Sequence, residues 1–399
     1  MSSDSGASRI DWADGQMPVL RSVRERFAVE RPLEGVKIGA CLHVTAETAN
    51  LARTLAAGGA ELALCAANPL STQDDVAAVL GEEMLVRAVH GVDPRPGIAE
   101  VAAWGPQVTL DDGADLIALL HDGDALVDGF LGATEATTTG LVRVRQMTLR
   151  CPVVALNEAH TERVFNDHYG TGQSTLDGIL RATNILLAGR TVVVLGYGFA
   201  GRGIATRARG AGAHVIVCEV DPLAALTARM EGFEVMPSLE AAARGDVFIT
   251  VTGTPRVLGA PHFAVMKDGA VLANAGHFDV EIDLDALAAS ATERKNVLPL
   301  VESFAVGGRR IHLLAQGRVV NLAASQGHPA EIMDISFAVQ ALAAAYLVIA
   351  GGTLAPGVHT VPDQIDHEVA RLKLDALSVR IDELTPEQRA YRSSWSGGS

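Results

Sequence analysis

Hydrophobic residues along this chain of 399 residues fall into two alternating patterns, short apolar runs and amphipathic stretches. A short unbroken apolar run is typical of a strand buried on both faces, and an apolar residue at every third or fourth position is typical of a helix. Because the two alternate, the pattern predicts parallel sheets covered by helices on both faces. In the first half, strands are expected at residues 36–42, 61–66, 84–88, 107–110 and 153–156, and helices at 46–57 and 73–80.

A second alternation begins with a helix near Leu176. Its strands are expected at residues 191–195, 215–219, 247–251, 270–274 and 311–314. Residues 330–375 then return to a helical pattern. The predicted fold class is α/β, with two doubly wound parallel-sheet domains and a ligand cleft at the carboxyl ends of both sheets.

One glycine-rich turn, Gly196-Tyr-Gly-Phe-Ala-Gly201, lies between an expected strand and an expected helix through Ala208. Gly196, Gly198 and Gly201 match the turn that binds a dinucleotide pyrophosphate. Glu219 closes the next strand, about 20 residues on, where a carboxylate holds the ribose hydroxyls of NAD and disfavours the 2′-phosphate of NADP. The context predicts bound NAD, against the alternative of a glycine-rich turn with no ligand.

The net charge indicates which classes of partner are not expected, and the cysteine content indicates the cellular compartment. The formal net charge is −15 and the pI is near 5.2, so nucleic acid and anionic membranes are not expected partners. The apolar run at residues 339–350 is shorter than a membrane span, and residues 1–16 lack the apolar core of a signal peptide. Four cysteines without CxxC spacing fit reduced thiols rather than a metal site. A cytoplasmic protein without metal is expected.

Further motifs occur along the whole chain in a recognisable order. They are Cys41-Leu-His-Val-Thr45, Ser71-Thr-Gln-Asp74, Leu110-Asp-Asp-Gly113, Thr137-Thr-Thr-Gly140, Asn274 to Asp283, and Asn321 through Gly327-His-Pro329. With the dinucleotide turn among them, the chain resembles the S-adenosylhomocysteine hydrolase (adenosylhomocysteinase) family. Thr171-Gly-Gln-Ser174, and a C-terminus without the lysine and tyrosine of longer members, resemble its short-tailed branch.

The resemblance implies a domain organisation. Residues 1–173 and 328–375 would form a discontinuous substrate-binding domain, residues 174–327 an NAD-binding Rossmann domain, and residues 376–399 a C-terminal tail. Hinges would lie near Gln173 and Gly327. A homotetramer or dimer is implied, with the apolar run at 339–350 as the candidate interface.

The resemblance also implies a reaction and its residues. NAD oxidises a nucleoside 3′-hydroxyl, which acidifies the C4′ hydrogen and allows the 5′ substituent to leave. Asp112 and His43 match the proton-transfer groups at C4′ and C5′, and His277 matches the histidine that faces the 3′ and 5′ oxygens. Contacts to the purine are implied for Thr45, Glu47, Gln73, His328 and Met333. Contacts to the nicotinamide half of NAD are implied for Thr137, Thr138, Thr139 and Asn321, and Asn274 lies in a cofactor-binding motif.

Each of these residues, taken alone, has an ordinary structural explanation. His43 and His328 would more often be histidines with no chemical role. The threonine run would be typical of a strand end, and Asp111-Asp112-Gly113 of a turn. Only their joint occurrence in the family context favours the functional interpretation.

Five positions depart from the family pattern, and four of them lie on the sugar side of the substrate. Ala136 replaces the second of two glutamates, and Glu162 replaces a lysine that contacts the ribose hydroxyls. Asn166 and Asp167 reverse an Asp-Asn pair, and Gln326 replaces a methionine. Glu162 is expected to act as the base on the 3′-hydroxyl, because a carboxylate is a competent base in a dry cleft.

These departures leave three hypotheses for the function. The first is an NAD-dependent lyase or dehydratase that acts on an adenine nucleoside with an altered sugar, for example a ketohexose nucleoside, and gives a 4′,5′-unsaturated product. The second is an S-adenosylhomocysteine or S-inosylhomocysteine hydrolase with an unusual ribose pocket. The third is a catalytically silent NAD-binding regulatory protein.

Overall fold

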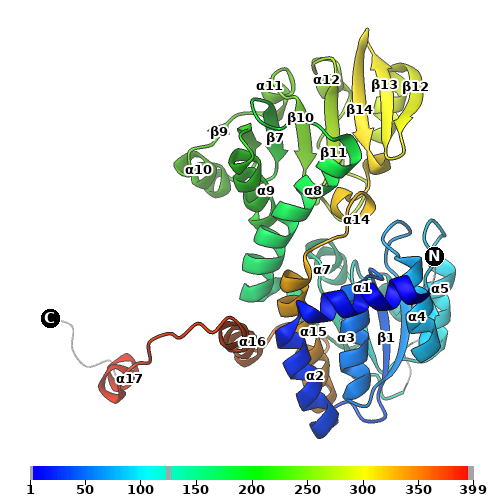
Figure 1. The fold of residues 1–399 in the computed structure, drawn as a ribbon, viewed down its shortest axis with the longest axis vertical. Coiled ribbons are helices and arrows are strands. Elements are labelled where there is room, and N and C mark those ends of the chain that lie inside the picture. Colours follow the sequence, from blue (N-terminus) through cyan, green and yellow to red (C-terminus); the bar gives the residue numbers. More distant parts are fainter. Residues whose placement is uncertain (1–2, 123–125, 127, 394–399) are drawn as a thin grey trace.

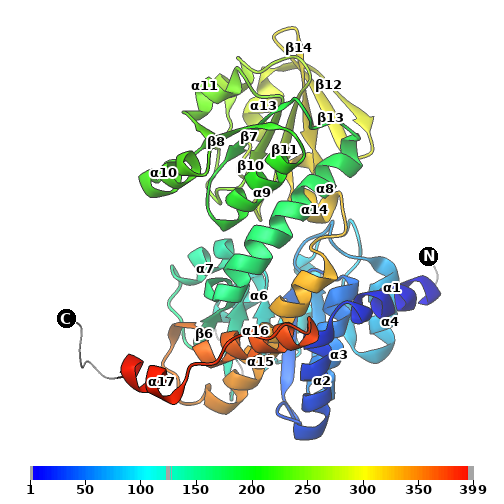
Figure 2. The same cartoon turned by 60° about the vertical axis from the view of Figure 1, so that its left-hand side comes forward.

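The computed structural model describes residues 3–122, 126 and 128–393, and its strands form two separate sheets (Figures 1 and 2). The first sheet has the order β15-β6-β5-β4-β1-β2-β3, and all of its pairs are parallel. Its strands are β1 Lys37–Leu42, β2 Glu61–Ala66, β3 Leu85–Arg87, β4 Val108–Asp111, β5 Gly132–Glu135, β6 Pro152–Ala155 and β15 Gly357–Thr360. The intervening helices are α3 Ala46–Ala57, α4 Asp74–Glu83, α5 Arg95–Ala103, α6 Asp115–His121 and α7 Thr138–Val144.

The second sheet has the order β12-β13-β14-β11-β10-β7-β8-β9. Its strands are β7 Thr191–Leu195, β8 His214–Cys218, β9 Glu234–Val235, β10 Val247–Thr250, β11 Ala270–Asn274, β12 Ala291–Leu298, β13 Val301–Val306 and β14 Arg309–Leu314. Its helices are α8 Gly172–Thr183, α9 Phe199–Gly210, α10 Pro222–Met230, α11 Ser238–Ala242, α12 Ala260–Phe263, α13 Leu284–Ser290 and α14 Val320–Ala323, with a 3-10 turn, η3, at Ala315–Gly317. The α/β fold class is confirmed, although β12 and β13 pair antiparallel and extend this sheet beyond its parallel part.

Two N-terminal helices, α1 Ser3–Gly15 and α2 Pro18–Glu30, were not expected from the sequence. Residues buried on α2 are Val19, Leu20, Val23 and Phe27, and this face packs on α3 and α15. Helix α1 packs on α3 and α4, so the polar N-terminal segment is part of the folded body from Ser3 onward.

The chain after residue 329 returns to the first sheet through α15 Ala330–Ala350, β15 and α16 Asp363–Ala376. Helix α15 has 21 residues, which is long and apolar enough to cross a membrane, but most of it is buried inside the protein. It packs on α2, α3 and α16, and Val339, Ala341 and Ala343 have no exposed surface. The run at 339–350 is thus part of a longer helix that is mostly buried in this core, and little of it remains exposed for the interface between protomers that the sequence suggested.

The crossing between the two sheets contains an unusual helix. After the 3-10 turn η1 Leu156–Glu158, the ten residues of η2 Glu162–Thr171 form a π-helix that runs directly into α8. π-Helices are rare in proteins, and those that occur are often found at functional sites. An added Cβ on Gly203 of α9 would lie 1.9 Å from the carbonyl oxygen of His168, so η2 and α9 touch through their backbones.

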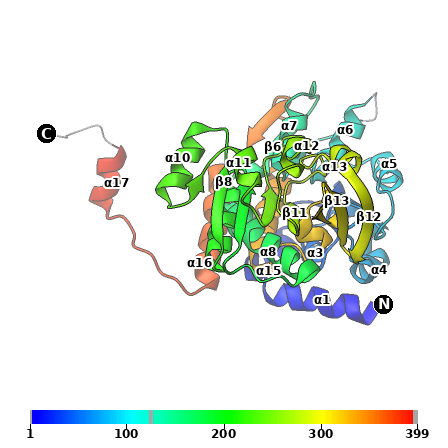
Figure 3. The same ribbon diagram turned by 90° about the horizontal axis from the view of Figure 1, so that it is seen from above.

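Beyond Ala376 an extended segment leads to α17 Pro386–Ser393, which stands away from the body in Figures 1 and 3. The extended segment carries the exposed apolar side chains of Leu377, Val379, Ile381 and Leu384.

Candidate active site between the two sheets

One large cavity, of about 1610 Å³, lies between the two sheets and is lined by residues from both. The carboxyl ends of β1, β4, β5 and β6 face it from one side, and those of β7, β8 and β11 from the other. Most of the expected site residues line this cavity, namely His43, Thr45, Glu47, Asp112, Ala136, Thr137, Thr138, Thr139, Glu162, Asn166, Asp167, Gly196, Gly198, Gly201, Glu219, His277, Asn321, Gln326, His328 and Met333. Gln73 and Asn274 are not among the residues that line it.

The glycine turn between β7 and α9 has the shape that a dinucleotide requires. Gly196 adopts a φ of 106°, and an added Cβ on Gly201 would lie 2.1 Å from the Gly196 carbonyl oxygen. Gly198 caps α9 without a side-chain hydrogen bond and faces open space, so the first N–H groups of the helix are available to an anion. These features fit the pyrophosphate of NAD.

Glu219 follows β8 at the adenosine end of this turn. Its Oε2 accepts the backbone N–H of Tyr197 at 2.6 Å, and its Oε1 accepts those of Val220 at 2.6 Å and Asp221 at 3.0 Å. The backbone thus holds the carboxylate in place while it faces the cavity, where it suits a diol and repels a phosphate.

The opposite end of the cofactor space contains an unpaired acceptor. Asn321 is 5% exposed, and its Nδ2 donates to Ser174 Oγ at 3.1 Å and to His328 Nε2 at 3.3 Å. Its Oδ1 is buried without a partner, which is the complement of an amide N–H donor such as the carboxamide of nicotinamide. Thr137, Thr138 and Thr139 line the cavity at the N-terminus of α7.

Asn274 holds the loop that carries His277. Its side chain is fully buried, and its Nδ2 donates to the carbonyls of Gly276, Phe278 and Gly317 at 2.8–3.1 Å. These bonds shape the loop that carries His277 toward the cavity. The side chain of Asn274 therefore positions His277 and does not itself face the cavity, contrary to its expected contact with the cofactor.

Three acid–base groups meet where the two sheets approach each other. His43 Nε2 lies 4.0 Å from Asp112 Oδ2, and the rings of His43 and His277 have centroids 6.0 Å apart. His43 Nδ1 contacts Ser71 Oγ at 2.7 Å, which orients the imidazole. His43 and Asp112 follow strands of the first sheet and His277 follows a strand of the second, so only the fold brings the three together.

Burial sets the protonation states of these groups. Desolvation, followed by the charge of Asp111, raises the pKa of Asp112 to about 7. Desolvation lowers the pKa of His43 to about 3, and that of His277 to about 4. Near neutral pH the imidazoles of His43 and His277 are therefore neutral, and the carboxyl group of Asp112 is partly protonated and partly ionised.

The residues that the sequence assigned to the sugar side, Glu162, Asn166 and Asp167, lie on η2 and face α15. Asn166 Nδ2 donates to Ser336 Oγ at 2.7 Å, and Asn157 Nδ2 donates to Asp167 Oδ2 at 3.4 Å. Desolvation, and then the charges of Asp167 and Asp112, raise the pKa of Glu162 to about 8, while a hydrogen bond from Ser336 opposes the shift. Glu162 is therefore mostly protonated at neutral pH, and the ionised fraction that can act as a base grows as the pH rises through about 8.

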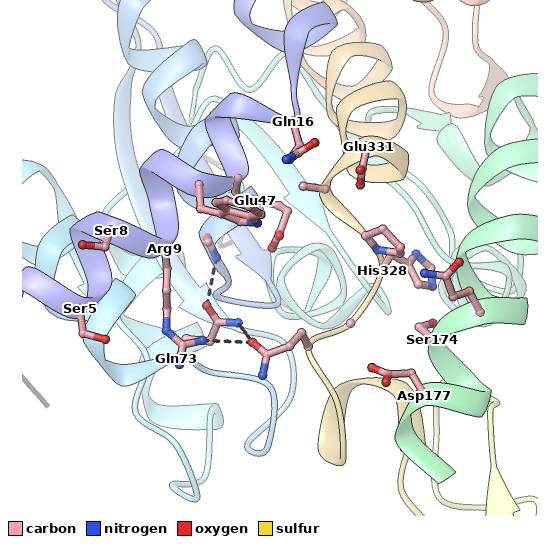
Figure 4. A pocket seen from close by; sticks show the side chains of 18 residues that line it. Ser5, Ser8, Arg9, Gln16, Glu47, Gln73, Ser174, Asp177, His328 and Glu331 are labelled. Atoms are coloured by element: carbon pink, nitrogen blue, oxygen red, sulfur yellow. Dashed lines mark hydrogen bonds between the residues drawn. The ribbon is translucent and has the colours of Figure 1, made fainter. Parts of the chain in front are cut away.

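The expected purine contacts divide between two cavities. Thr45 and Met333 line the large cavity, Gln73 lines a neighbouring one of about 600 Å³, and Glu47 and His328 line both. Figure 4 shows this smaller cavity, with Glu47, Gln73 and His328 at its edge. Gln326 Oε1 accepts hydrogen bonds from Arg9 at 3.0 Å and Gln73 at 3.4 Å, so it ties α1 to the crossing segment.

Several buried polar residues around the cavity were not expected from the sequence. Glu135, Ser336 and Gln340 are buried on its inner side, and Glu281 accepts three hydrogen bonds from Thr252 and Gly253 beside the glycine turn. Asp366 of α16 accepts the backbone N–H of His160 at 2.7 Å and that of Thr161 at 3.2 Å, and so holds the start of η2. For Ser336 and Gln340 the available signal was a polar residue within the apolar run of α15. Among the described residues, no cluster of histidine, cysteine or acidic side chains suits a metal ion.

Comparison with known proteins assigns this architecture. Residues 1–130 match the family model described as S-adenosyl-L-homocysteine hydrolase, and residues 167–327 match the NAD binding domain of the same enzyme. An adenosylhomocysteinase from Aquifex aeolicus (strain VF5) is 55% identical over 407 residues, which cover 99% of this chain and 97% of that protein. The chain belongs to the S-adenosyl-L-homocysteine hydrolase family. It is therefore an enzyme of that family, and its cofactor is NAD.

Other members of the family are similarly close. An adenosylhomocysteinase from Saccharolobus solfataricus is 50% identical over 404 residues, with 99% of this chain and 97% of that protein covered. An S-inosyl-L-homocysteine hydrolase from Methanopyrus kandleri is 51% identical over 406 residues, with 99% and 96% covered. These sequence identities hold over nearly the whole chain. Differences in function between family members must therefore be sought in individual side chains.

A solved structure outside the family has the same arrangement of the fold. A dipicolinate synthase chain from Bacillus halodurans aligns with a TM-score of 0.51 and 15% identity over 79% of this chain and 99% of that one. At this identity the likeness concerns the fold alone.

Proposed function

We propose that this family member oxidises the 3′-hydroxyl of an adenine nucleoside with an altered sugar and expels the 5′ substituent, as an NAD-dependent lyase or dehydratase. The observation that carries the proposal is Glu162, a buried carboxyl group where the family pattern has a lysine. Ala136 adds space on the same wall, because a methyl group stands where the pattern has a glutamate. A ketohexose nucleoside, which bears an extra hydroxymethyl group, fits such an enlarged and acidic wall.

The chain's own residues account for the proton movements. Bound NAD would supply a hydride acceptor for the 3′ carbon. Ionised Glu162 takes the proton of the 3′-hydroxyl as the ketone forms, and ionised Asp112 takes the proton of C4′, which the neighbouring ketone has acidified. His43, 4.0 Å from Asp112, is placed to pass a proton to the departing 5′ oxygen.

The elimination balances without a further reactant. The C4′–H and C5′–O bonds break, a C4′=C5′ double bond forms, and the C4′ proton leaves with the 5′ hydroxide as water. The reduced cofactor would supply the hydride that restores C3′, and Glu162 returns its proton to the 3′ oxygen. The product is a 4′,5′-unsaturated nucleoside, and exclusion of bulk water from the cavity would keep water from adding to it.

The second candidate is hydrolysis of S-adenosylhomocysteine or S-inosylhomocysteine. It is favoured by the names of relatives that are 50–55% identical over nearly the whole chain, and this similarity supports it more directly than anything supports the dehydratase. The two differ in the sugar of the substrate, in the leaving group and in whether water is added after elimination. A silent NAD-binding regulatory protein is the weakest candidate, since His43, Asp112 and His277 all face the cavity.

Product analysis decides between the candidates. Purified protein with NAD would be incubated separately with S-adenosylhomocysteine, S-inosylhomocysteine, adenosine and the 1′-hydroxymethyl (ketohexose) adenine nucleoside, and analysed by mass spectrometry. Loss of one water from the ketohexose nucleoside, with little homocysteine released, supports the dehydratase. Homocysteine release at the rate of an ordinary family member overturns it in favour of the hydrolase, and no conversion of any substrate favours the regulatory protein.

We further propose that the substrate-binding domain comprises residues 1–173 and 328–375 and the NAD-binding domain residues 174–327, with hinges near Gln173 and Gly327. The strands of the first sheet lie within residues 37–155 and 357–360, and those of the second within residues 191–314, which agrees with this division. A homo-oligomer is also proposed, with the exposed apolar segment after Ala376 as the contact in place of α15.

A further inference from the structure

Glu135 joins the two turns of the first sheet that face the reaction. It lies at the end of β5 and has no exposed surface. Its Oε1 accepts the backbone N–H of Gly113 at 3.0 Å, the backbone N–H of Thr137 at 2.7 Å and the hydroxyl of Thr137 at 2.7 Å. A single carboxyl oxygen therefore connects the turn after β4 with the turn before α7.

Each of these turns carries a group used in the proposed reaction. Asp112, the proposed base at C4′, immediately precedes Gly113, and its own N–H is anchored on Cys41 O at 3.0 Å. Thr137 is the N-cap of α7 and accepts the N–H of Gly140 at 2.9 Å, which sets the direction of the threonines that line the cofactor space. Glu135 thus lies between the proton-transfer group and the cofactor-binding threonines.

There is no spare space around this connection. A Cβ added to Gly140 would lie 2.2 Å from Cδ of Glu135, so only glycine fits there. Gly113 has a φ of 108°, and a Cβ on it would lie 2.7 Å from Nε2 of His277. The unit formed by Glu135, Gly113 and Thr137 therefore also abuts the histidine contributed by the other sheet.

The charge state of Glu135 matters because Asp112 is close. Oε2 of Glu135 is buried without a hydrogen-bond partner. Burial, with a further contribution from the charge of Asp112, raises the pKa of Glu135 to about 8, although the hydrogen bonds from Thr137 and Gly113 oppose the shift. A neutral Glu135 still accepts all three hydrogen bonds on Oε1 and adds no second negative charge beside Asp112.

We propose that Glu135 is a positioning residue that locks the turn of Asp112 to the cofactor-binding turn of Thr137 through the three hydrogen bonds that its Oε1 accepts. It fixes the distance between the base and the bound nicotinamide without contacting either. The inference rests on the proposed roles of Asp112 and Thr137, which the proposed function supplies. It extends to any substrate that this reaction accepts.

The test compares Glu135→Gln with Glu135→Ala. Glutamine keeps an acceptor oxygen of the same reach and is neutral, whereas alanine removes all three hydrogen bonds. NAD affinity would be measured by calorimetry on stripped protein, and solvent deuterium exchange at C4′ would be followed from pH 5 to 9 in reconstituted protein. Thermal unfolding of each variant would show that the protein is folded.

We expect the glutamine variant to bind NAD within about twofold of the wild type and to keep the pH midpoint of exchange near that of Asp112. The alanine variant is expected to bind NAD about tenfold more weakly and to exchange at least about 100-fold more slowly, as for loss of a correctly placed base. If the alanine variant does not fold, Glu135→Asp keeps the carboxyl group but is one methylene too short to reach both turns, and it should show the same two losses.

Two results would overturn the inference. A fall of the exchange midpoint by one pH unit in Glu135→Gln would mean that Glu135 is ionised beside Asp112 in the wild type. An alanine or aspartate variant that is folded and unchanged in both NAD affinity and exchange would mean that the connection has no positioning role. The calorimetric arm needs no substrate, so it still tests Glu135 if the wild type exchanges no nucleoside, an outcome that would instead refute the proposed function.

Discussion

Nε2 of His43 lies 4.0 Å from Oδ2 of Asp112, at a distance that a small movement converts into a hydrogen bond. Because burial keeps the imidazole neutral while Asp112 titrates near pH 7, the carboxylate is the stronger base of the pair. This difference supports the proposal that Asp112 abstracts the C4′ proton and that His43 serves the 5′ oxygen.

Asp112→Asn should abolish deuterium exchange at C4′ while NADH still forms, because hydride transfer precedes the proton step. The expected loss of exchange is about 10²–10⁴-fold. Mass spectrometry in deuterium oxide and NADH absorbance measure the two steps separately. Asp268→Asn, which breaks an exposed ion pair with Arg310, is the matched control and should change neither. Normal exchange in the Asp112 variant would show that another group is the base.

Glu162→Ala should suppress NADH formation itself, because Glu162 is the proposed base on the 3′-hydroxyl. In the wild type the carboxyl group must be ionised to act, and its pKa is about 8, so the rate of NADH formation should rise with pH through about 8. Single-turnover absorbance measured from pH 6 to 9 checks this. A rate that falls as the pH rises through this range would assign Glu162 a role as an acid.

Restoring the family pattern should redirect the substrate preference. Ala136→Glu with Glu162→Lys should raise homocysteine release from S-adenosylhomocysteine and lower conversion of a nucleoside with an enlarged sugar. The two substitutions made singly are the controls. Glu162→Lys alone would place a lysine near Asp167 without the glutamate that accompanies it in the family pattern. If the wild type already releases homocysteine rapidly, this wall does not set the preference.

Protein stripped of cofactor should regain activity with NAD and not with NADP. The carboxylate of Glu219, held by three backbone N–H groups, would meet the 2′-phosphate of NADP and repel it. Activity measured after refilling with each cofactor provides the test. Equal recovery with NADP would refute the assignment of Glu219.

A homo-oligomer should depend on the C-terminal segment. Its apolar side chains Leu377, Val379, Ile381 and Leu384 are 39–68% exposed in the single chain, whereas α15 is already buried within it. Light scattering should detect a dimer or tetramer for the full chain and a smaller species for a variant that ends at Ala376. A clean monomer of the full chain at micromolar concentration would contradict the expectation.

The fold was predictable where buried strands alternate with helices. The expected strands at 61–66, 191–195 and 270–274 agree with β2, β7 and β11, because unbroken runs of apolar residues fit only the centre of a sheet. Helix α1 was missed because few of its positions are apolar. Helix α2 has a helical spacing of apolar residues at Val19, Leu20, Val23 and Phe27, so its sequence did carry a signal that was overlooked. Strand β12 was missed because its residues are exposed on both faces of an edge hairpin, where no alternation is required.

The candidate site was predictable only as a set of residue types. The motifs indicated His43, Asp112 and His277, but not that burial makes both histidines neutral, since a pKa depends on surroundings that no motif records. For the same reason the sequence suggested a base at Glu162, while the folded protein holds this group protonated at neutral pH. Glu135 escaped notice because its partners come from two different turns.

The π-helical register of η2 also constrains how this protein tolerates changes in length. In a π-helix, residues four and five positions apart share a face, so Glu162, Asn166 and Asp167 all reach the same cavity. Deleting one residue between 163 and 170 would allow an ordinary α-helix, in which each position turns by about 100°. Downstream side chains would then rotate away from the substrate, and the backbone contact with Gly203 would be lost. Single substitutions in this segment should therefore be far better tolerated than single-residue deletions, so divergence within the family should proceed here by exchange of side chains at constant length.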